Sequence, residues 1–241
     1  MNPLSAETPP FAPVVVLAFL ASAAFLCVSL LTLVIGLWRK SRMIQQGSVL
    51  AVCLLVAVYA GILLCLSFLS HEIVLPMEGR KYFCEIDCHI AYSVQSAVEA
   101  ANVGGELQQL TSKGDFIVVG VRSWFDPQTI SPGRGDGPLT PNGRHIALVG
   151  DDGRLIAPSG QQEGVLAALR LHSVPLRTEL HPGESYVSYF VFELPASVGD
   201  PKVLLTSTDE ETPILWGHEN SWFHKKIYLR LPQGLSSAAL Q

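Results

Sequence analysis

Charge is scarce at the start of this chain, where only four of the first 70 residues are acidic or basic. Two long runs contain no charge at all, residues 13–38 and residues 48–70. A helix of about 20 apolar residues crosses the roughly 30 Å hydrocarbon core of a bilayer. The first run also lacks the preceding basic residues of a signal peptide and is too long for its apolar region. We therefore expect two transmembrane helices, at residues 13–38 and 48–70.

Familiar catalytic motifs are lacking as well. The sequence contains no G-x-S-x-G, no H-E-x-x-H and no phosphate-binding loop. The uncharged runs offer no path for an ion or a proton. Of the 16 Lys and Arg, 13 follow residue 70, against 20 of the 21 Asp and Glu, so that part of the chain is acidic. It has no basic stripe, and we expect no nucleic-acid partner. No small-molecule substrate is indicated.

The few basic residues near the two runs predict how the chain is oriented. Residues 39–47 hold three basic residues and no acidic one, whereas residues 1–12 hold only one acidic residue. Basic loops remain on the cytoplasmic side of a membrane. Arg80 and Lys81 follow the second run and favour the opposite orientation, but they are fewer. We expect a cytoplasmic loop at residues 39–47, an external N-terminal tail at residues 1–12, and an extracytoplasmic domain at residues 71–241.

The remaining residues, 71–241, are numerous enough for one domain with its own core. Short segments rich in Val, Ile, Tyr and Phe alternate with Gly- and Pro-containing turns, a pattern typical of an antiparallel β sandwich. The expected strands are residues 90–94, 116–125, 145–149, 154–157, 185–194, 202–206 and 226–231. The third and fourth of these are separated by Gly-Asp-Asp-Gly, which predicts a β hairpin.

Three segments of this domain depart from the strand pattern. Residues 161–170, QQEGVLAALR, predict a short helix, and residues 94–110 have room for a helical turn or two. Residues 128–144 form a long loop rich in Pro and Gly. Loops of this length usually carry function or are disordered.

The run ELHPGESYVSYFVFELPASV, residues 179–198, resembles a late-strand signature of bacterial immunoglobulin-like lipoprotein and membrane-anchored domains. In those domains a Pro-Gly-Glu turn leads into a strand that ends in Phe-x-Leu-Pro or Phe-x-Val-Pro. The resemblance implies an all-β domain with an immunoglobulin-like antiparallel sandwich, attached to the bacterial inner membrane by the two-helix hairpin.

The whole-chain plan is also similar to that of cytochrome oxidase subunit two, in which a transmembrane hairpin precedes an external β sandwich. That family holds copper in a C-x-x-x-C motif near the end of its domain, and Cys84 and Cys88 have the same spacing. Here, however, the pair opens the domain, and His89 follows it directly. The resemblance therefore implies the topology and not the copper site.

Cys84, Cys88 and His89 form the densest cluster of reactive side chains in the chain. On a straight strand the two cysteines would lie about 13 Å apart, so any joint role requires a turn at residues 85–87. Four roles are consistent with the cluster. They are a disulfide in an oxidising compartment, a copper or zinc site, a redox-active dithiol like that of membrane-anchored copper chaperones, and covalent attachment of haem.

A metal site would need further ligands, and His218 and His224 are the best candidates. Both lie in the segment WGHENSWFH, just before the last expected strand. The first and last strands of such sandwiches are often neighbours, so either histidine could approach Cys84. The alternative is that this segment is a polar turn with aromatic residues that fill space.

We therefore expect a non-catalytic binding or accessory subunit of a larger membrane complex, with the lipid bilayer and other membrane-protein subunits as its partners. A copper-handling or electron-transfer subunit that uses Cys84, Cys88 and His89 is the first alternative. A thiol-disulfide oxidoreductase is the second. No cofactor is required by the residues, and copper or zinc is the one that the cluster favours.

Overall fold

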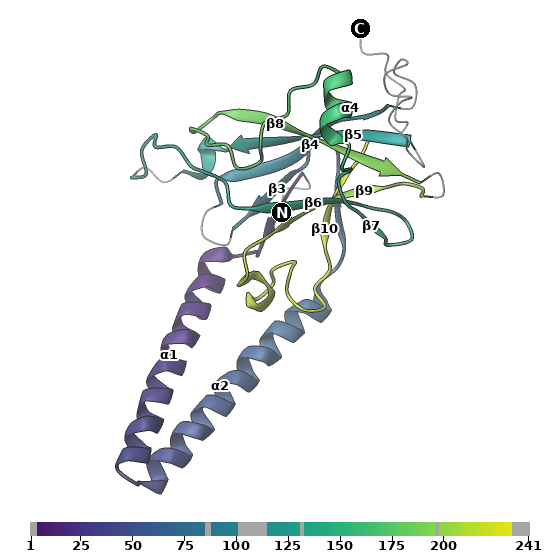
Figure 1. The fold of residues 1–241 in the computed structure, drawn as a ribbon. Coiled ribbons are helices and arrows are strands. Elements are labelled where there is room, and N and C mark those ends of the chain that lie inside the picture. The colour runs from purple at the N-terminus through teal and green to yellow at the C-terminus, as the bar shows by residue number, and fades with distance from the viewer. Residues whose placement is uncertain (1–3, 85–87, 101–114, 131–132, 196–197, 233–241) are drawn as a thin grey trace.

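The computed structural model describes residues 4–84, 88–100, 115–130, 133–195 and 198–232. Two long helices, α1 (Ala12–Trp38) and α2 (Arg42–Leu69), form a hairpin that projects from a β domain (Figure 1). Both helices are long and apolar enough to cross a membrane, and most of their side chains are exposed. Prolonged apolar runs without a core around them are typical of membrane-spanning helices.

The second helix begins earlier than the sequence predicts, at Arg42 instead of residue 48. Met and Gln are good helix formers, so the helix continues back from the apolar run into the basic linker. The turn between the helices is tight, because a Cβ atom on Gly36 would lie only 2.8 Å from the Ile44 side chain. Gln45 also donates its side-chain N–H to the Gly36 carbonyl at 3.1 Å.

The β domain contains two five-stranded sheets. Sheet A has the order β1 (Ser5–Thr8), β3 (Arg80–Phe83), β4 (Ile90–Glu99), β5 (Asp115–Phe125) and β8 (Ser185–Leu194). Sheet B has the order β2 (Ile73–Leu75), β10 (Ile227–Arg230), β9 (Lys202–Ser207), β6 (Arg144–Val149) and β7 (Leu155–Ile156).

Both sheets are mixed, which corrects the prediction of a purely antiparallel domain. β1 pairs parallel with β3, and β2 pairs parallel with β10, whereas the other neighbours are antiparallel. The two parallel pairs arise because β1 precedes the helical hairpin and β2 follows it. Parallel neighbours need a long connection, and the hairpin supplies the one between β1 and β3. The structure therefore contains two mixed sheets, and it does not confirm an immunoglobulin-like arrangement of the strands.

Most of the predicted elements are present. The hairpin of β6 and β7 is confirmed, and so is the short helix, α4 (Gln162–Ala168). Residues 94–99 belong to β4, so the helical turn expected there is wrong up to that point; residues 101–110 lie outside the described residues. The sequence did not predict β1, β2 and β3, because three or four residues are too few to show an alternating pattern.

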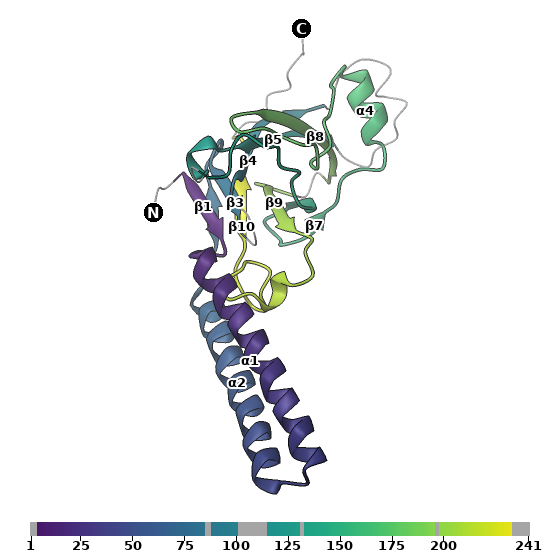
Figure 2. The same cartoon turned by 90° about the vertical axis from the view of Figure 1, so that its left-hand side faces the viewer.

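One core lies between the two sheets. Its buried side chains come from sheet A, among them Phe83, Tyr92 and Phe192, and from sheet B, among them Leu148 and Leu205. A second, smaller cluster forms where α4 covers one end of sheet A (Figures 1 and 2). The rest of that outer face is left for other contacts.

Both ends of the hairpin lead into this same domain. β1 enters sheet A immediately before α1, and β2 enters sheet B shortly after α2. Figure 2 shows β1 descending directly into α1 at the foot of the domain. The N-terminal segment is therefore structurally part of the β domain, which reaches beyond the predicted limits of residues 71–241.

Candidate functional site

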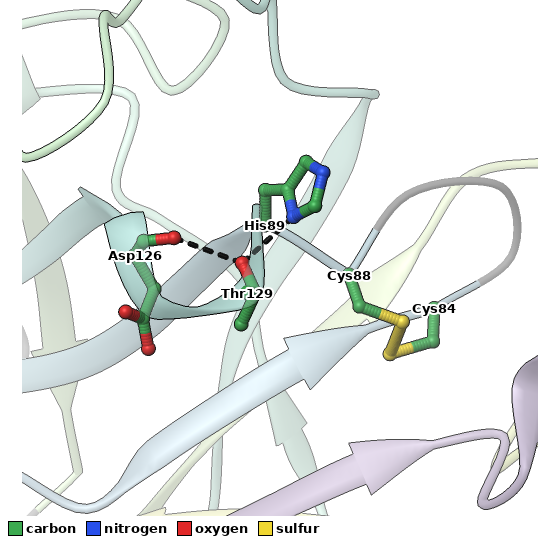
Figure 3. The surroundings of a disulfide bond; sticks show 5 residues. All are labelled: Cys84, Cys88, His89, Asp126 and Thr129. Carbon is green, nitrogen blue, oxygen red and sulfur yellow. Dashed lines mark hydrogen bonds between the residues drawn. A yellow bond between two sulfur atoms is a disulfide. The ribbon is translucent and has the colours of Figure 1, made fainter. Parts of the chain in front are cut away.

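The connection between β3 and β4 is closed by a disulfide between Cys84 and Cys88 (Figure 3). The two strands are antiparallel neighbours, so the end of one and the start of the other lie together and bring the two Cα atoms to 4.4 Å. This separation is compatible with a disulfide. Cys84 is buried and Cys88 is half-buried. Of the four possible roles of this cysteine pair, the disulfide is the one that the structure contains.

The disulfide lies where α1 meets the β domain. Cys84 packs in a small apolar cluster with Ala12, Tyr82 and Ala91. Its backbone N–H donates to the carbonyl of Thr8 at 2.9 Å, at the end of β1. The disulfide therefore fixes the end of β3, which is the strand that pairs with β1 just before α1 begins.

His89 contacts the turn that follows β5, whereas a metal site shared with the two cysteines would require its ring to face the sulfur atoms. Its Nδ1 lies 2.7 Å from the Thr129 hydroxyl, and that hydroxyl donates to the carbonyl of Asp126 at 2.8 Å. The dashed lines of Figure 3 show this chain of contacts leading away from the sulfur atoms. The ring also stacks on Phe125 at 5.6 Å between centroids. His89 thus connects the start of β4 to the turn η1 (Pro127–Thr129).

The carboxylate of Asp126 joins this region to β3. It accepts a hydrogen bond from the Tyr82 hydroxyl at 2.7 Å and lies 4.0 Å from the Arg80 guanidinium. The pKa of Tyr82 is raised to about 12, mainly by burial and to a smaller extent by the hydrogen bond to Asp126. Tyr82 therefore remains a protonated donor at neutral pH.

His218 and His224 lie in the segment between β9 and β10, residues 208–226, which we call the junction loop. His218 is fully buried, and its Nδ1 accepts the backbone N–H of Asn220 at 2.9 Å. The Nδ1 of His224 lies 2.7 Å from the Lys225 carbonyl. Burial lowers the pKa of His224, which favours the neutral imidazole.

The predicted metal set is Cys84, Cys88, His89, His218 and His224. Within the residues that the structure describes, which omit 85–87, no three His, Cys, Asp or Glu side chains are grouped closely enough to hold a metal ion. The cysteines are joined to each other, and the three imidazoles contact other groups. A copper or zinc site formed by these five residues stays a prediction, because the described residues contain no group of side chains that could serve as its ligands.

A buried ion pair that the sequence did not predict crosses the domain. The Lys81 ammonium lies 2.8 and 2.7 Å from the two carboxylate oxygens of Glu219, and both side chains are fully buried. Lys81 also donates to the carbonyls of Leu205 and Ile227, at 2.6 and 2.9 Å. The Ile227 N–H donates to Glu219 at 3.0 Å. The pair thus joins both sheets to the junction loop.

Burial sets the character of this pair. Desolvation lowers the pKa of Lys81, and the adjacent Glu219 opposes that shift. A buried charge needs a partner and further hydrogen bonds, and both are present here. No local pattern predicted the burial of Lys81, because β3 is too short to be predicted; once β3 is known, Lys81 shares a face with Phe83, which is a core residue.

The exposed end of sheet A carries a polar groove of about 280 Å³. It is lined by Glu78, Arg80, Ala91, Ser93, Gln95, Arg122 and Trp124. The Arg80 guanidinium lies 4.1 Å from the Trp124 ring centroid, and Arg122 donates to the Ser185 hydroxyl at 3.1 Å. A second hollow of about 480 Å³ continues from Glu78 and Arg80 past Asp126. Together they form a hydrogen-bonding surface beside the disulfide.

Comparisons with known proteins add little to this description. No protein-family model matches the chain, and no curated protein does. A 2.2 Å crystal structure of a conserved hypothetical protein from Bacillus anthracis is similar to it at 17% sequence identity and a TM-score of 0.35. That match covers 52% of this chain and 85% of the other.

Proposed function

We propose that this chain is a membrane-anchored, extracytoplasmic binding or accessory subunit of a larger membrane complex, and that it performs no catalysis itself. The hairpin of α1 and α2 spans a bacterial inner membrane, with the three basic residues of the inter-helix turn and its borders on the cytoplasmic side. The β domain, a variant of the immunoglobulin-like sandwich, presents its polar groove to a protein partner.

The observation that carries the proposal is the placement of β1 and β2. Each strand flanks one end of the hairpin, and both belong to one folded domain. If the helices cross the membrane, the two ends must lie on the same side of it. The Cys84–Cys88 disulfide supports the oxidising side, because disulfides persist outside the cytoplasm.

The groove supports binding through its chemistry. It offers two guanidinium groups, a carboxylate, a hydroxyl, an amide and an indole on a strand face that α4 leaves open. Arg and Trp are the side chains that most often dominate binding energy at protein interfaces. A surface of this kind suits a partner with acceptor groups and a flat apolar patch.

The location can be tested with thiol chemistry on cells whose inner membrane is intact and accessible. In a variant with Cys27, Cys53 and Cys65 changed to alanine, a membrane-impermeant maleimide should label nothing until an impermeant reductant is added. The half-buried Cys88 thiol should then react, because reduction frees it on the outer side of the membrane, and the buried Cys84 thiol should react as well once the domain is denatured. Mass spectrometry counts the labels.

The Cys84→Ser/Cys88→Ser variant is the control for labelling elsewhere. Labelling only after the membrane is permeabilised would place the domain in the cytoplasm. Release of the thiols by a chelator without reductant would favour the copper-handling alternative. Rapid turnover of the disulfide by a small dithiol would favour a thiol-disulfide oxidoreductase.

The binding role can be tested by isolating the tagged chain from solubilised membranes of its own host. The wild type should bring other membrane proteins with it in fixed ratio. Arg80→Glu/Arg122→Glu, which reverses both guanidinium charges at exposed positions, should lose them. Arg154→Glu is the matched control, because Arg154 is exposed on the β6–β7 turn and lines no part of the groove. Isolation of the wild type alone would contradict the proposal.

A further inference from the structure

The junction loop lies along the side of α2 rather than above its end. The Tyr59 hydroxyl donates to the Ile214 carbonyl at 2.8 Å, and the Trp216 indole N–H donates to the Tyr59 carbonyl at 3.2 Å. The two rings lie 4.8 Å apart between centroids. Figure 1 shows the loop between the diverging ends of the two helices. On the α1 side, the backbone N–H of Glu219 donates a hydrogen bond to the Thr8 hydroxyl of β1 at 3.0 Å.

The contact with Tyr59 places the loop at the level of the membrane surface. The 28-residue α2 is about 42 Å long, so about 12 Å of it extends beyond a 30 Å hydrocarbon core. Tyr59 lies ten residues before the end of α2 at Leu69, which is about 15 Å along the axis. Even if all the excess length lay at the β domain, Tyr59 would be at or just inside the boundary of the hydrocarbon. A tilted helix would bring it deeper.

The loop is built to tolerate this position, because its polar groups are satisfied within the protein. The Asn220 amide donates to the Ser207 carbonyl and to the Thr212 hydroxyl, at 3.1 and 3.2 Å. The Ser221 hydroxyl donates to the Leu215 carbonyl. The only carboxylate that is fully buried in the loop, among its described residues, is neutralised by Lys81. Irregular backbone is accepted near hydrocarbon only when it is satisfied in this way.

The outer surface of the loop is aromatic. Trp222 is 60% exposed and Phe223 is 68% exposed, although both are large apolar side chains. Phe223 stacks on Phe68 of α2 at 5.4 Å between centroids, so the aromatic surface continues onto the helix. Exposed Lys225 follows, and its backbone N–H donates to the Ser70 hydroxyl at 2.8 Å. Exposed Glu210 and Glu211 lie at the other end of the loop.

From these contacts we infer that the junction loop is a bilayer-interface element. Trp222 and Phe223, together with Phe68, enter the boundary between the lipid headgroups and the acyl chains, where aromatic side chains are enriched. The loop holds the β domain at a fixed height and angle above the membrane. This inference rests on the proposed function, because it requires that α1 and α2 span the bilayer.

The test uses single-tryptophan variants of the full chain in phosphatidylcholine vesicles, with and without brominated acyl chains that quench indole fluorescence. The other three of the four tryptophans are changed to phenylalanine in each variant. Trp38, at the far end of α1, reports the opposite interface, and Trp124 reports the β domain. Trp222 should be quenched to the same extent as Trp38, and Trp124 should be unaffected.

The outcomes separate the inference from the proposed function. Quenching of Trp38 without quenching of Trp222 would overturn the loop inference alone, and would indicate that a protein partner or water covers this surface. Absence of quenching at both positions would overturn the membrane anchoring and the inference with it. Equal quenching of Trp124 would also overturn the inference, since the whole domain would then contact lipid.

A second measurement needs no substitution, which guards against variants that misfold. A carbene precursor dissolved in the bilayer is activated by light in vesicles that contain the wild-type chain. The tryptic peptide of residues 203–225 should be labelled together with the peptides of both helices. Labelled helices with an unlabelled 203–225 peptide would overturn the inference.

Discussion

Lys81→Met is expected to lower the free energy of unfolding by about 3–5 kcal/mol, because it leaves the Glu219 carboxylate buried without a positive charge beside it. The loss is a large fraction of the stability of a typical domain, about 5–15 kcal/mol. Denaturant titration of the chain in detergent, followed by tryptophan fluorescence, measures it. Met keeps most of the volume of the Lys stem, so the effect reports the charge and its hydrogen bonds.

Two further variants serve as controls for this measurement. Lys202→Met removes the partly exposed ion pair with Glu72, whose atoms are also 2.7 Å apart, and should cost only about 0–1 kcal/mol. Lys81→Met/Glu219→Leu removes both buried charges and should recover part of the loss. Recovery stays incomplete because the Ile227 N–H and the Leu205 carbonyl lose their partners. A cost for Lys81→Met no larger than that for Lys202→Met would contradict the role given to the buried pair.

Removal of the N-terminal segment is expected to have a similarly large effect. A chain that begins at Glu78 lacks β1 and β2 and should show little cooperative unfolding, although its remaining strands are intact. β1 contributes buried Ala6 and Thr8, and β2 contributes buried Leu75. Loss of a buried leucine alone typically costs about 2–5 kcal/mol. Two newly exposed strand edges would also promote aggregation.

Replacement of the hairpin should restore folding where truncation abolishes it. Residues 4–9 joined to residues 71–241 by a Gly/Ser linker of about 20 residues, with a root-mean-square span of about 25 Å, keep both edge strands. Far-ultraviolet circular dichroism and thermal unfolding should show a cooperative β-rich domain. Equal stability of the chain that begins at Glu78 would contradict the assignment of β1 and β2 to the domain.

The buried pair and the junction loop are parts of one arrangement. Glu219 sits in the middle of the junction loop, its side chain bound to β3 through Lys81 and its backbone N–H bound to Thr8 of β1. The aromatic side chains a few residues further on contact α2. The loop therefore links both helix ends to both sheets. Through this loop, a change in the distance between the two helix ends would either move the sheets or be resisted by them.

The sequence determined the features that depend on local pattern. Two uncharged runs were sufficient to predict α1 and α2, because a long apolar helix is stable in a membrane without tertiary partners. The Gly-Asp-Asp-Gly turn was sufficient for the hairpin of β6 and β7, and the segment around α4 for a short helix. In each case the interacting residues are close together in the chain, so one stretch contains the whole signal.

Only the tertiary structure decided how distant segments combine. The parallel pairing of β1 with β3 joins residues on opposite sides of the hairpin, and the Lys81–Glu219 pair joins residues 138 positions apart. The spacing of Cys84 and Cys88 left four roles open, and the pairing of β3 with β4 decided for the disulfide by bringing the sulfur atoms together. The physical reason is common to all three. Contacts across a fold depend on which strands become neighbours, and periodicity within a strand records its buried face but not its partner.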